Sequence, residues 1–215
     1  MRKGYAIMIA VLTLVASVAG CGRTGRPALR TGDLVFVNIP ADYDLELGST
    51  SGTADKIMIH VAILDVAGDS VSIIDATIKR GVARYPLDTF LHDFTLRDGS
   101  LPTFEIKRPS VSAREASEFV DNAKEYLGLP YDVSFLPDNG AMYCSELVYN
   151  SYVTSDGKHL FSETPISFLD AGGRLPVYWK QLFDLLGKEV PQGVTGTIPQ
   201  TMSEDSVLKH VRSGF

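Results

Sequence analysis

Between residues 34 and 107, four short apolar segments predict β-strands. They cover residues 34–39, 57–66, 71–78 and 103–107. The segment 57–66 is apolar on both faces, which is typical of a strand in the middle of a sheet. A hairpin over residues 67–69, Ala-Gly-Asp, joins it to the next strand. The pattern therefore predicts a sheet in which the segment 57–66 is central.

Two ionisable residues interrupt these apolar strands. His60 lies in the central strand, and strict alternation places it on the same face as Met58 and Ala62. Asp75 lies in the neighbouring hairpin strand, where it can lie beside His60 across the ladder. Because burying ionisable side chains without mutual pairing is costly, the two residues are more readily explained together than separately.

The periodicity becomes helical after residue 112. Ser112 and Glu115 have the spacing of a capping box at the start of a helix. An apolar stripe follows and runs to Leu127, and Gly128 and Pro130 are expected to end the helix.

Further helices are predicted in the second half of the chain. One should run from 143 to 152 with Cys144 in its first turn, and another from 177 to 186. The segment 192–199 is expected to be extended, and a short helix is expected over 205–212. Strands followed by helices, without internal repeats, predict one α+β domain.

The N-terminal residues have the pattern of an export signal. Arg2 and Lys3 precede an apolar run over residues 5–19, which is shorter than the roughly 20 residues that span a bilayer and suits a signal peptide. Residues 18–21, Val-Ala-Gly-Cys, resemble the lipobox of bacterial lipoproteins. That resemblance implies cleavage before Cys21, acylation of Cys21 and stable anchoring in a membrane. An ordinary secretory signal with an incidental cysteine is the alternative.

This interpretation divides the chain into a signal peptide (1–20), a polar tether (21–31) and one domain (32–215). Removal of the signal peptide takes away two basic residues, so the formal charge changes from −6 to −8. A chain this acidic does not favour nucleic acid as a partner. The acidic segment 40–55 is interpreted either as a solvated loop or as the rim of a cleft.

Cys144 is the cysteine that remains for chemistry once Cys21 carries lipid. At a helix start, free backbone N–H groups and the helix dipole stabilise a thiolate. A cysteine nucleophile also needs an imidazole to accept and return its proton, and a carboxylate to orient that imidazole. Cys144, His60 and Asp75 therefore form a candidate catalytic set. The structural alternatives are a small core cysteine, a satisfied strand histidine and an aspartate that serves a turn or a cap.

Short segments spread over nearly the whole mature chain resemble the YiiX-like permuted papain-type cysteine amidases of the NlpC superfamily. In chain order they read GDLVF (32–36), IHVAI (59–63), IDA (74–76), GV (81–82), PL (86–87), GLPYD (128–132) and YCSELV (143–148). In that family the histidine and its polar partner precede the cysteine, the reverse of the order in papain. The same order is present in this chain.

The resemblance implies a permuted papain-like (NlpC-type) fold, with an antiparallel sheet or half-barrel packed against helices. It implies Cys144 as nucleophile, His60 as general base and then acid, and Asp75 as the orienting residue. Relatives carry a glutamate where this chain has Asp75. Tyr143 and Tyr131 fall in matching segments, where either can line the cleft, help to hold the oxyanion or serve packing. The backbone N–H of Cys144 is a further candidate oxyanion donor.

The implied activity is hydrolysis of an amide bond through a thioester, with a peptide or amide substrate such as a peptidoglycan stem peptide. No cofactor is expected, and no metal, since no pair of possible ligands has zinc-type spacing. The predicted location is the bacterial cell envelope, with the protein anchored by lipid and facing outside the cytoplasm. Two alternatives stay open. One is a lipid acyltransferase or acyl hydrolase that uses the same cysteine, as in enzymes similar to lecithin-retinol acyltransferase; the other is a non-catalytic binding lipoprotein.

Overall fold

The computed structural model describes residues 27–45, 55–137, 139–170 and 172–215. The predicted signal peptide (1–20), the lipidation site Cys21 and residues 46–54 of the acidic segment lie outside the described residues, so the predictions about them stay predictions. Within the described ranges, no helix combines the length and the apolar character needed to cross a bilayer.

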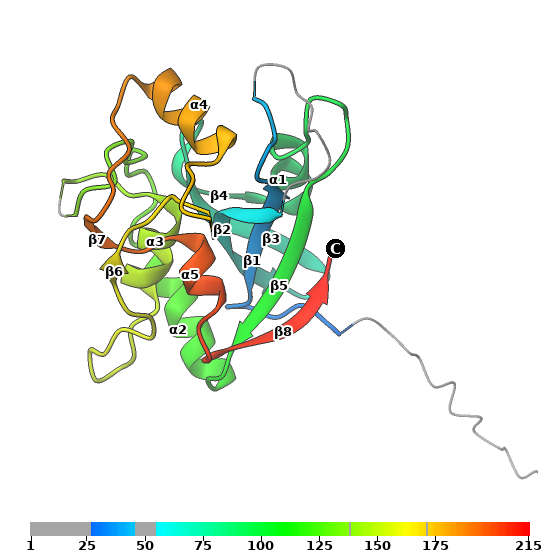
Figure 1. Cartoon of the computed structure of the whole chain (residues 1–215). Coiled ribbons are helices and arrows are strands. Elements are labelled where there is room, and N and C mark those ends of the chain that lie inside the picture. Colours follow the sequence, from blue (N-terminus) through cyan, green and yellow to red (C-terminus); the bar gives the residue numbers. More distant parts are fainter. Residues whose placement is uncertain (1–26, 46–54, 138, 171) are drawn as a thin grey trace, which may run out of the picture.

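Six strands form an antiparallel sheet in the spatial order β4-β3-β2-β1-β5-β8 (Figure 1). Their bounds are β1 Leu34–Pro40, β2 Lys56–Ala67, β3 Ser70–Thr77, β4 Gly81–Pro86, β5 Thr103–Pro109 and β8 Leu208–Ser213. The four strands predicted from the apolar pattern are confirmed to within two residues at each end. As predicted, β2 lies inside the sheet, between β3 and β1. The α+β class with an antiparallel sheet is therefore confirmed.

Five helices and a small second sheet complete the described fold. The helices are α1 Leu87–Asp93, α2 Ala113–Lys124, α3 Cys144–Ser151, α4 Val177–Leu186 and α5 Pro199–Ser203, and the small sheet pairs β6 Thr164–Pro165 with β7 Thr195–Gly196. Figure 1 shows α2, α3 and α5 together on one side of the large sheet, whereas α1 contacts β3 and β4. The predictions for α3 and α4 are confirmed.

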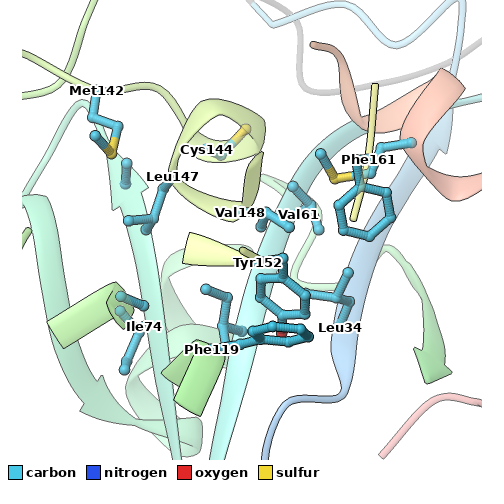
Figure 2. Packing of buried hydrophobic residues seen from close by; sticks show 14 of the residues in the cluster. Leu34, Val61, Ile74, Phe119, Met142, Cys144, Leu147, Val148, Tyr152 and Phe161 are labelled. Carbon is cyan, nitrogen blue, oxygen red and sulfur yellow. The ribbon is translucent and has the colours of Figure 1, made fainter. Parts of the chain in front are cut away.

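The face of the sheet under α2 and α3 is an apolar core. Phe119 from α2 and Leu147 from α3 are fully buried there, and the ring of Tyr152 packs on that of Phe119 at 4.7 Å (Figure 2). The Tyr152 hydroxyl donates a hydrogen bond of 3.0 Å to the carbonyl of Gly32. Burial of each large apolar side chain contributes about 1.5–3 kcal/mol, so this core anchors both helices on the sheet.

The opposite face has its own apolar cluster, in which polar residues are embedded. Leu64, Ile73 and Phe90 are fully buried in it. His60 and Asp75 are buried on the same face, with the His60 ring next to Phe90. Both candidate residues therefore lie on the face away from α2 and α3.

A β-bulge in β2 changes which residues share a face. Val37 pairs with His60, but the next residue of β1, Asn38, pairs with Met58, so that Ile59 is an extra residue in β2. Met58 consequently packs in the core under α2 and α3, whereas His60 faces the other way. The predicted shared face of Met58 and His60 is wrong, because strict alternation fails at a bulge.

The capping box of α2 is confirmed, but its predicted end is not. Ser112 Oγ accepts a hydrogen bond from the Glu115 backbone N–H at 3.2 Å, and Glu115 accepts one from the Ser112 N–H at 3.0 Å. The helix ends at Lys124, and Leu127 is exposed. The chain leaves the helix because the Gly128 N–H and the Val82 carbonyl form a hydrogen bond of 2.9 Å that ties this turn to β4.

The predicted helix over residues 205–212 is wrong. That region forms β8, which pairs with β5 and covers the edge that β5 would otherwise expose. A short helix does occur, but earlier, at α5, where Pro199 occupies the first helical position. Strand β4 and helix α1 were not predicted from the apolar pattern.

Candidate active site

The two polar residues of the sheet are hydrogen-bonded to each other. His60 Nε2 lies 2.9 Å from Asp75 Oδ2. The β2–β3 ladder pairs Ile63 with Ile74, and continuing that register places Asp75 diagonal to His60 on the same face. The predicted proximity of the two residues is thus present, in a diagonal rather than a directly opposed pair. The short side chain of the aspartate is long enough to reach the imidazole.

Tyr85 also binds Asp75, and sequence reasoning missed it. Its hydroxyl donates to the carboxylate and lies 2.8 Å from both oxygens. Burial, followed by the charge of Asp75, raises the pKa of Tyr85 far above its ordinary value, so this hydroxyl stays protonated and acts as a donor. Recognising β4 as a strand would have placed Tyr85, which pairs with Ile73, on the face of Asp75.

Aromatic rings enclose the imidazole. The ring of Phe94 lies 4.8 Å from that of His60, and the ring of Phe90 lies 6.3 Å from it. His60 is 6% exposed and Asp75 is fully buried. Water is therefore largely excluded from the hydrogen bond that joins them, which strengthens its electrostatic component.

Cys144 is the first residue of α3, as predicted, and is 4% exposed. Tyr143 is the N-cap residue, and its backbone N–H donates to the Glu146 carboxylate at 3.3 Å. Cys144 belongs to the same packed cluster as Val61 and Ala76, which are the chain neighbours of His60 and Asp75. Figure 2 shows Cys144 at the start of the helix, away from the rings of Phe119 and Tyr152 deeper in the core.

The Cys144 side chain is close enough to His60 to change its ionisation. Burial by itself lowers the pKa of His60, but the charge of Cys144 and hydrogen bonds to Asp75 and Cys144 outweigh it and raise the pKa to about 10. Because Nε2 is bound to Asp75, Nδ1 is the ring nitrogen left for the sulfur. The three predicted residues are therefore brought together.

Tyr143 and Tyr131 differ in their surroundings. The Tyr143 hydroxyl accepts a hydrogen bond from the Thr197 backbone N–H at 3.2 Å, and its ring packs on Phe135 at 5.0 Å. Burial raises the pKa of Tyr143 to about 12. Tyr131 lines the cleft beside His60, and burial followed by the charge of Cys144 raises its pKa well above the ordinary value. Tyr131 is thus close to the sulfur, whereas the hydroxyl of Tyr143 is engaged with the backbone.

A cleft of about 290 Å³ opens beside His60. Its walls are mainly apolar and aromatic and include Ile59, Phe94, Tyr131, Tyr178, Trp179 and Leu182. Lys79 and Asp93, joined by an ion pair of 2.6 Å, also line it. Tyr178 was not predicted as a site residue; burial and then the charge of Cys144 raise its pKa, which places it near the sulfur.

No three histidine, cysteine, aspartate or glutamate side chains gather into a metal-binding group in the part of the chain that the structure describes. His60 and Cys144 are two possible ligands, but the Nε2 atom of His60 already binds Asp75. A zinc site needs at least three protein ligands around one point.

Comparisons with known proteins identify the family and the fold. A family described as "Permuted papain-like amidase enzyme, YaeF/YiiX, C92 family" matches residues 28–212. The chain is 29% identical over 101 residues to the uncharacterized protein YiiX of Escherichia coli K12, an alignment that spans 49% of that relative's length.

A solved structure has the same fold. The crystal structure of YiiX from Escherichia coli O157:H7, described as a metalloprotein, superposes with a TM-score of 0.62 at 22% identity. The match covers 89% of this chain and 99% of that one. By the family match over residues 28–212, the chain belongs to the C92 family of permuted papain-like amidases, a family of cysteine hydrolases.

Proposed function

We propose that the protein is a thiol-dependent amidase or peptidase in which Cys144 is the nucleophile, His60 the general base and acid, and Asp75 the orienting carboxylate. The observation that carries the proposal is the hydrogen bond of 2.9 Å between His60 and Asp75, next to a Cys144 whose charge raises the pKa of His60. A buried imidazole between a carboxylate and a first-turn cysteine has the arrangement that nucleophilic catalysis requires.

The raised pKa of His60, about 10, favours a protonated imidazole at neutral pH. When the Cys144 thiol passes its proton to Nδ1, a thiolate and an imidazolium form the reactive pair. Asp75 stabilises the imidazolium through Nε2 without taking its proton. The positive end of the α3 dipole adds to the stability of the thiolate.

In the first half of the reaction, the thiolate attacks the amide carbonyl and forms the C–S bond. The negative charge moves to the carbonyl oxygen, where the backbone N–H of Cys144, unpaired within the helix because it lies in the first turn, can donate to it. Collapse of this intermediate breaks the C–N bond, and the imidazolium gives its proton to the leaving amine.

In the second half, neutral His60 takes a proton from a water molecule that attacks the thioester. The C–S bond breaks and a carboxylic acid is released. His60 keeps the proton taken from water and the sulfur leaves as a thiolate, so the imidazolium and the Cys144 thiolate are restored for the next cycle.

A peptide of the bacterial cell wall is the substrate class that we propose first. The amidase description of the family supports an amide bond, and the lipobox-like segment at Cys21 supports a location outside the cytoplasm where such peptides occur.

A second candidate is transfer or hydrolysis of a lipid acyl group. The specific observation in its favour is the cleft wall, where Phe94, Trp179 and Leu182 present apolar surface close to His60. Apolar walls of this kind bury hydrocarbon better than they bury the polar backbone of a stem peptide.

Among the residues that the structure describes, the side chains of the site do not fit a metal ion, although the YiiX relative of known structure is described as a metalloprotein. In the described ranges of this chain, the donors beside Cys144 and His60 are tyrosine hydroxyls and Asp75, whose two oxygens already bind His60 and Tyr85. No step of the proposed reaction passes through a metal.

Mass spectrometry can separate the two candidates. Purified protein is incubated with a cell-wall stem peptide or with phospholipid vesicles, quenched in acid and examined for a mass increment on the peptide that contains Cys144. We expect an increment from the stem peptide that is absent in Cys144→Ala. An increment from phospholipid alone would favour acyl chemistry, and no increment from either would contradict both candidates.

The proposed anchor has a separate test. Radiolabelled palmitate fed to a bacterial host should enter the wild-type protein and Cys144→Ser, but not Cys21→Ser. Equal labelling of Cys21→Ser would contradict acylation at that residue. Cys144→Ser is the matched control because it removes the other cysteine of the chain.

A further inference from the structure

The carboxylate of Asp75 is held from two neighbouring strands. His60 of β2 lies 2.9 Å from Oδ2, and the Tyr85 hydroxyl of β4 lies 2.8 Å from both oxygens. Tyr85 pairs with Ile73, so it is diagonal to Asp75 on one side of β3, as His60 is diagonal to it on the other. Three adjacent strands thus contribute one residue each to a buried polar row.

We propose that Tyr85 is a positioning residue of the hydrolytic centre, whose hydroxyl fixes the Asp75 carboxylate in the orientation that keeps Oδ2 on His60. The proposal rests on the function proposed above. Tyr85 does not act on the substrate; its effect on Cys144 passes through Asp75 and His60.

The complete burial of Asp75 explains why such a residue is needed. A carboxylate has acceptor capacity for about four hydrogen bonds, and a buried one that lacks donors is costly. Among the described residues, the side chains that bind Asp75 are His60 and Tyr85. Without the Tyr85 hydroxyl, Oδ1 would be buried without a donor, and the carboxylate would gain by rotating away from Nε2.

Tyr85 is itself held in place. The guanidinium carbon of Arg80 lies 4.8 Å from the centre of its ring, and Arg80 forms an ion pair of 2.7 Å with Asp93. A cation over the ring face stabilises the ring in this position. The donor is therefore fixed both by the backbone of β4 and by a side chain packed over its ring.

The test measures the reactivity of Cys144 and needs no substrate. The rate of carbamidomethylation by iodoacetamide is followed from pH 5 to 10 in the wild type, Tyr85→Phe, Asp75→Asn and the double variant. The thiolate of Cys144 reacts with iodoacetamide and the thiol does not, so the dependence of the rate on pH shows how readily Cys144 passes its proton to His60. Other titratable groups around this set are Tyr131 and Tyr178 on the cleft side and the Arg80–Asp93 pair on the side of Tyr85.

We expect Tyr85→Phe to lower the labelling rate at pH 6 by about tenfold, the worth of a hydrogen bond to a charged group, and to move the profile toward the free-thiol value near pH 8.5. Asp75→Asn should move it further in the same direction. The double variant should match Asp75→Asn, because a residue that acts through Asp75 has no further effect once the carboxylate is gone.

The control for a lost buried hydroxyl is Tyr152→Phe, which removes the hydrogen bond to the Gly32 carbonyl on the other face of the sheet. Its labelling profile should equal that of the wild type. An unchanged profile in Tyr85→Phe, or additive shifts in the double variant, would overturn the positioning role. If the profile shifts as expected but no substrate is hydrolysed, the proposed function fails while the effect of Tyr85 on Cys144 stands.

The unaltered protein provides a second measurement, which does not depend on the folding of a variant. A hydroxyl proton held by a buried carboxylate exchanges slowly with water. Proton NMR should therefore show a signal for the Tyr85 hydroxyl proton, which is recognised by its short distance in space to the ring protons of Tyr85. Rapid exchange of that proton would also overturn the proposal.

Discussion

The two faces of β3 bury different kinds of residue, although they alternate along the same strand. Ile74 and Ala76 face α2 and α3 in the apolar core. Ile73 and Asp75 face the other way, where Asp75 connects His60 with Tyr85. Both faces are buried. On the face under the helices the volume of the side chain matters most, whereas on the other face its polar groups matter most.

On the helix-covered face, stability comes from filled volume, and a similar apolar residue can replace another at small cost. On the other face, each polar group satisfies the next one, so the loss of one member leaves a buried group without its partner. Changes of the apolar residues packed under α2 and α3 should therefore reduce the free energy of unfolding, whereas changes in the row of His60, Asp75 and Tyr85 should reduce reactivity more than stability.

The largest effect is expected from His60→Ala. Without the imidazole, Cys144 has no proton acceptor, and kcat should fall roughly 10⁴- to 10⁶-fold, as when a member of a catalytic triad is removed. The measurement is steady-state hydrolysis of the substrate that forms the Cys144 thioester, with circular dichroism to verify folding. A folded variant that keeps more than about a tenth of the wild-type rate would contradict the role of His60.

The next largest effect should come from Leu147→Ala on the helix-covered face. Leu147 is fully buried, and truncation of such a leucine costs about 2–5 kcal/mol through lost burial and the cavity that remains. Urea unfolding followed by fluorescence measures the loss. The pH profile of Cys144 labelling should stay unchanged, and a shifted profile would show that the two faces are not independent.

Cys144→Ala should lower the pKa of His60 from about 10, because Cys144 is among the causes that raise it while burial lowers it. A His60 pKa above its ordinary 6.5 means that the protonated ring contributes stability that is fully present below pH 6.5 and is lost as the pH rises through about 10. In the variant this loss should occur at lower pH. NMR titration of the imidazole ring protons measures the shift, and an unchanged pKa would show that Cys144 does not act on His60.

The smallest effect is expected from Tyr152→Phe. Loss of its hydrogen bond to Gly32 should reduce the free energy of unfolding by about 1 kcal/mol. Thermal unfolding beside Tyr85→Phe would compare one lost hydroxyl on each face. Similar losses of stability with different labelling profiles would support the distinction between the faces, whereas a shifted profile in Tyr152→Phe would weaken it.

The sequence pattern was sufficient to predict the long strands and three of the helices, although it placed the end of α2 too late. In β2 and β3 the apolar runs rich in Ile and Val are long enough to distinguish a strand from a helix. It failed at β8, where Lys209 and His210 lie in a strand because β5 provides a partner, not because the sequence favours a strand. It also failed for Tyr85, since β4 is short and half-exposed and has no clear alternation.

Within the site, Cys144, His60 and Asp75 could be selected because each is an ionisable residue in an apolar segment. Tyr178 could not, since a tyrosine in an amphipathic helix looks like an ordinary packing residue. Its place in the cleft depends on how α4 docks, which is a tertiary property without a local signal.

The extra residue at Ile59 has a consequence for anyone who aligns or edits this chain. In a regular strand, inserting or deleting one residue exchanges the two faces for everything beyond that point. The bulge is the exception, because without Ile59 the side chain of His60 would still pair with Val37 and that of Met58 with Asn38, and plain alternation would keep them on opposite faces. Family members should therefore be aligned here by their pairing with β1, with a gap allowed at Ile59, and not by unbroken spacing.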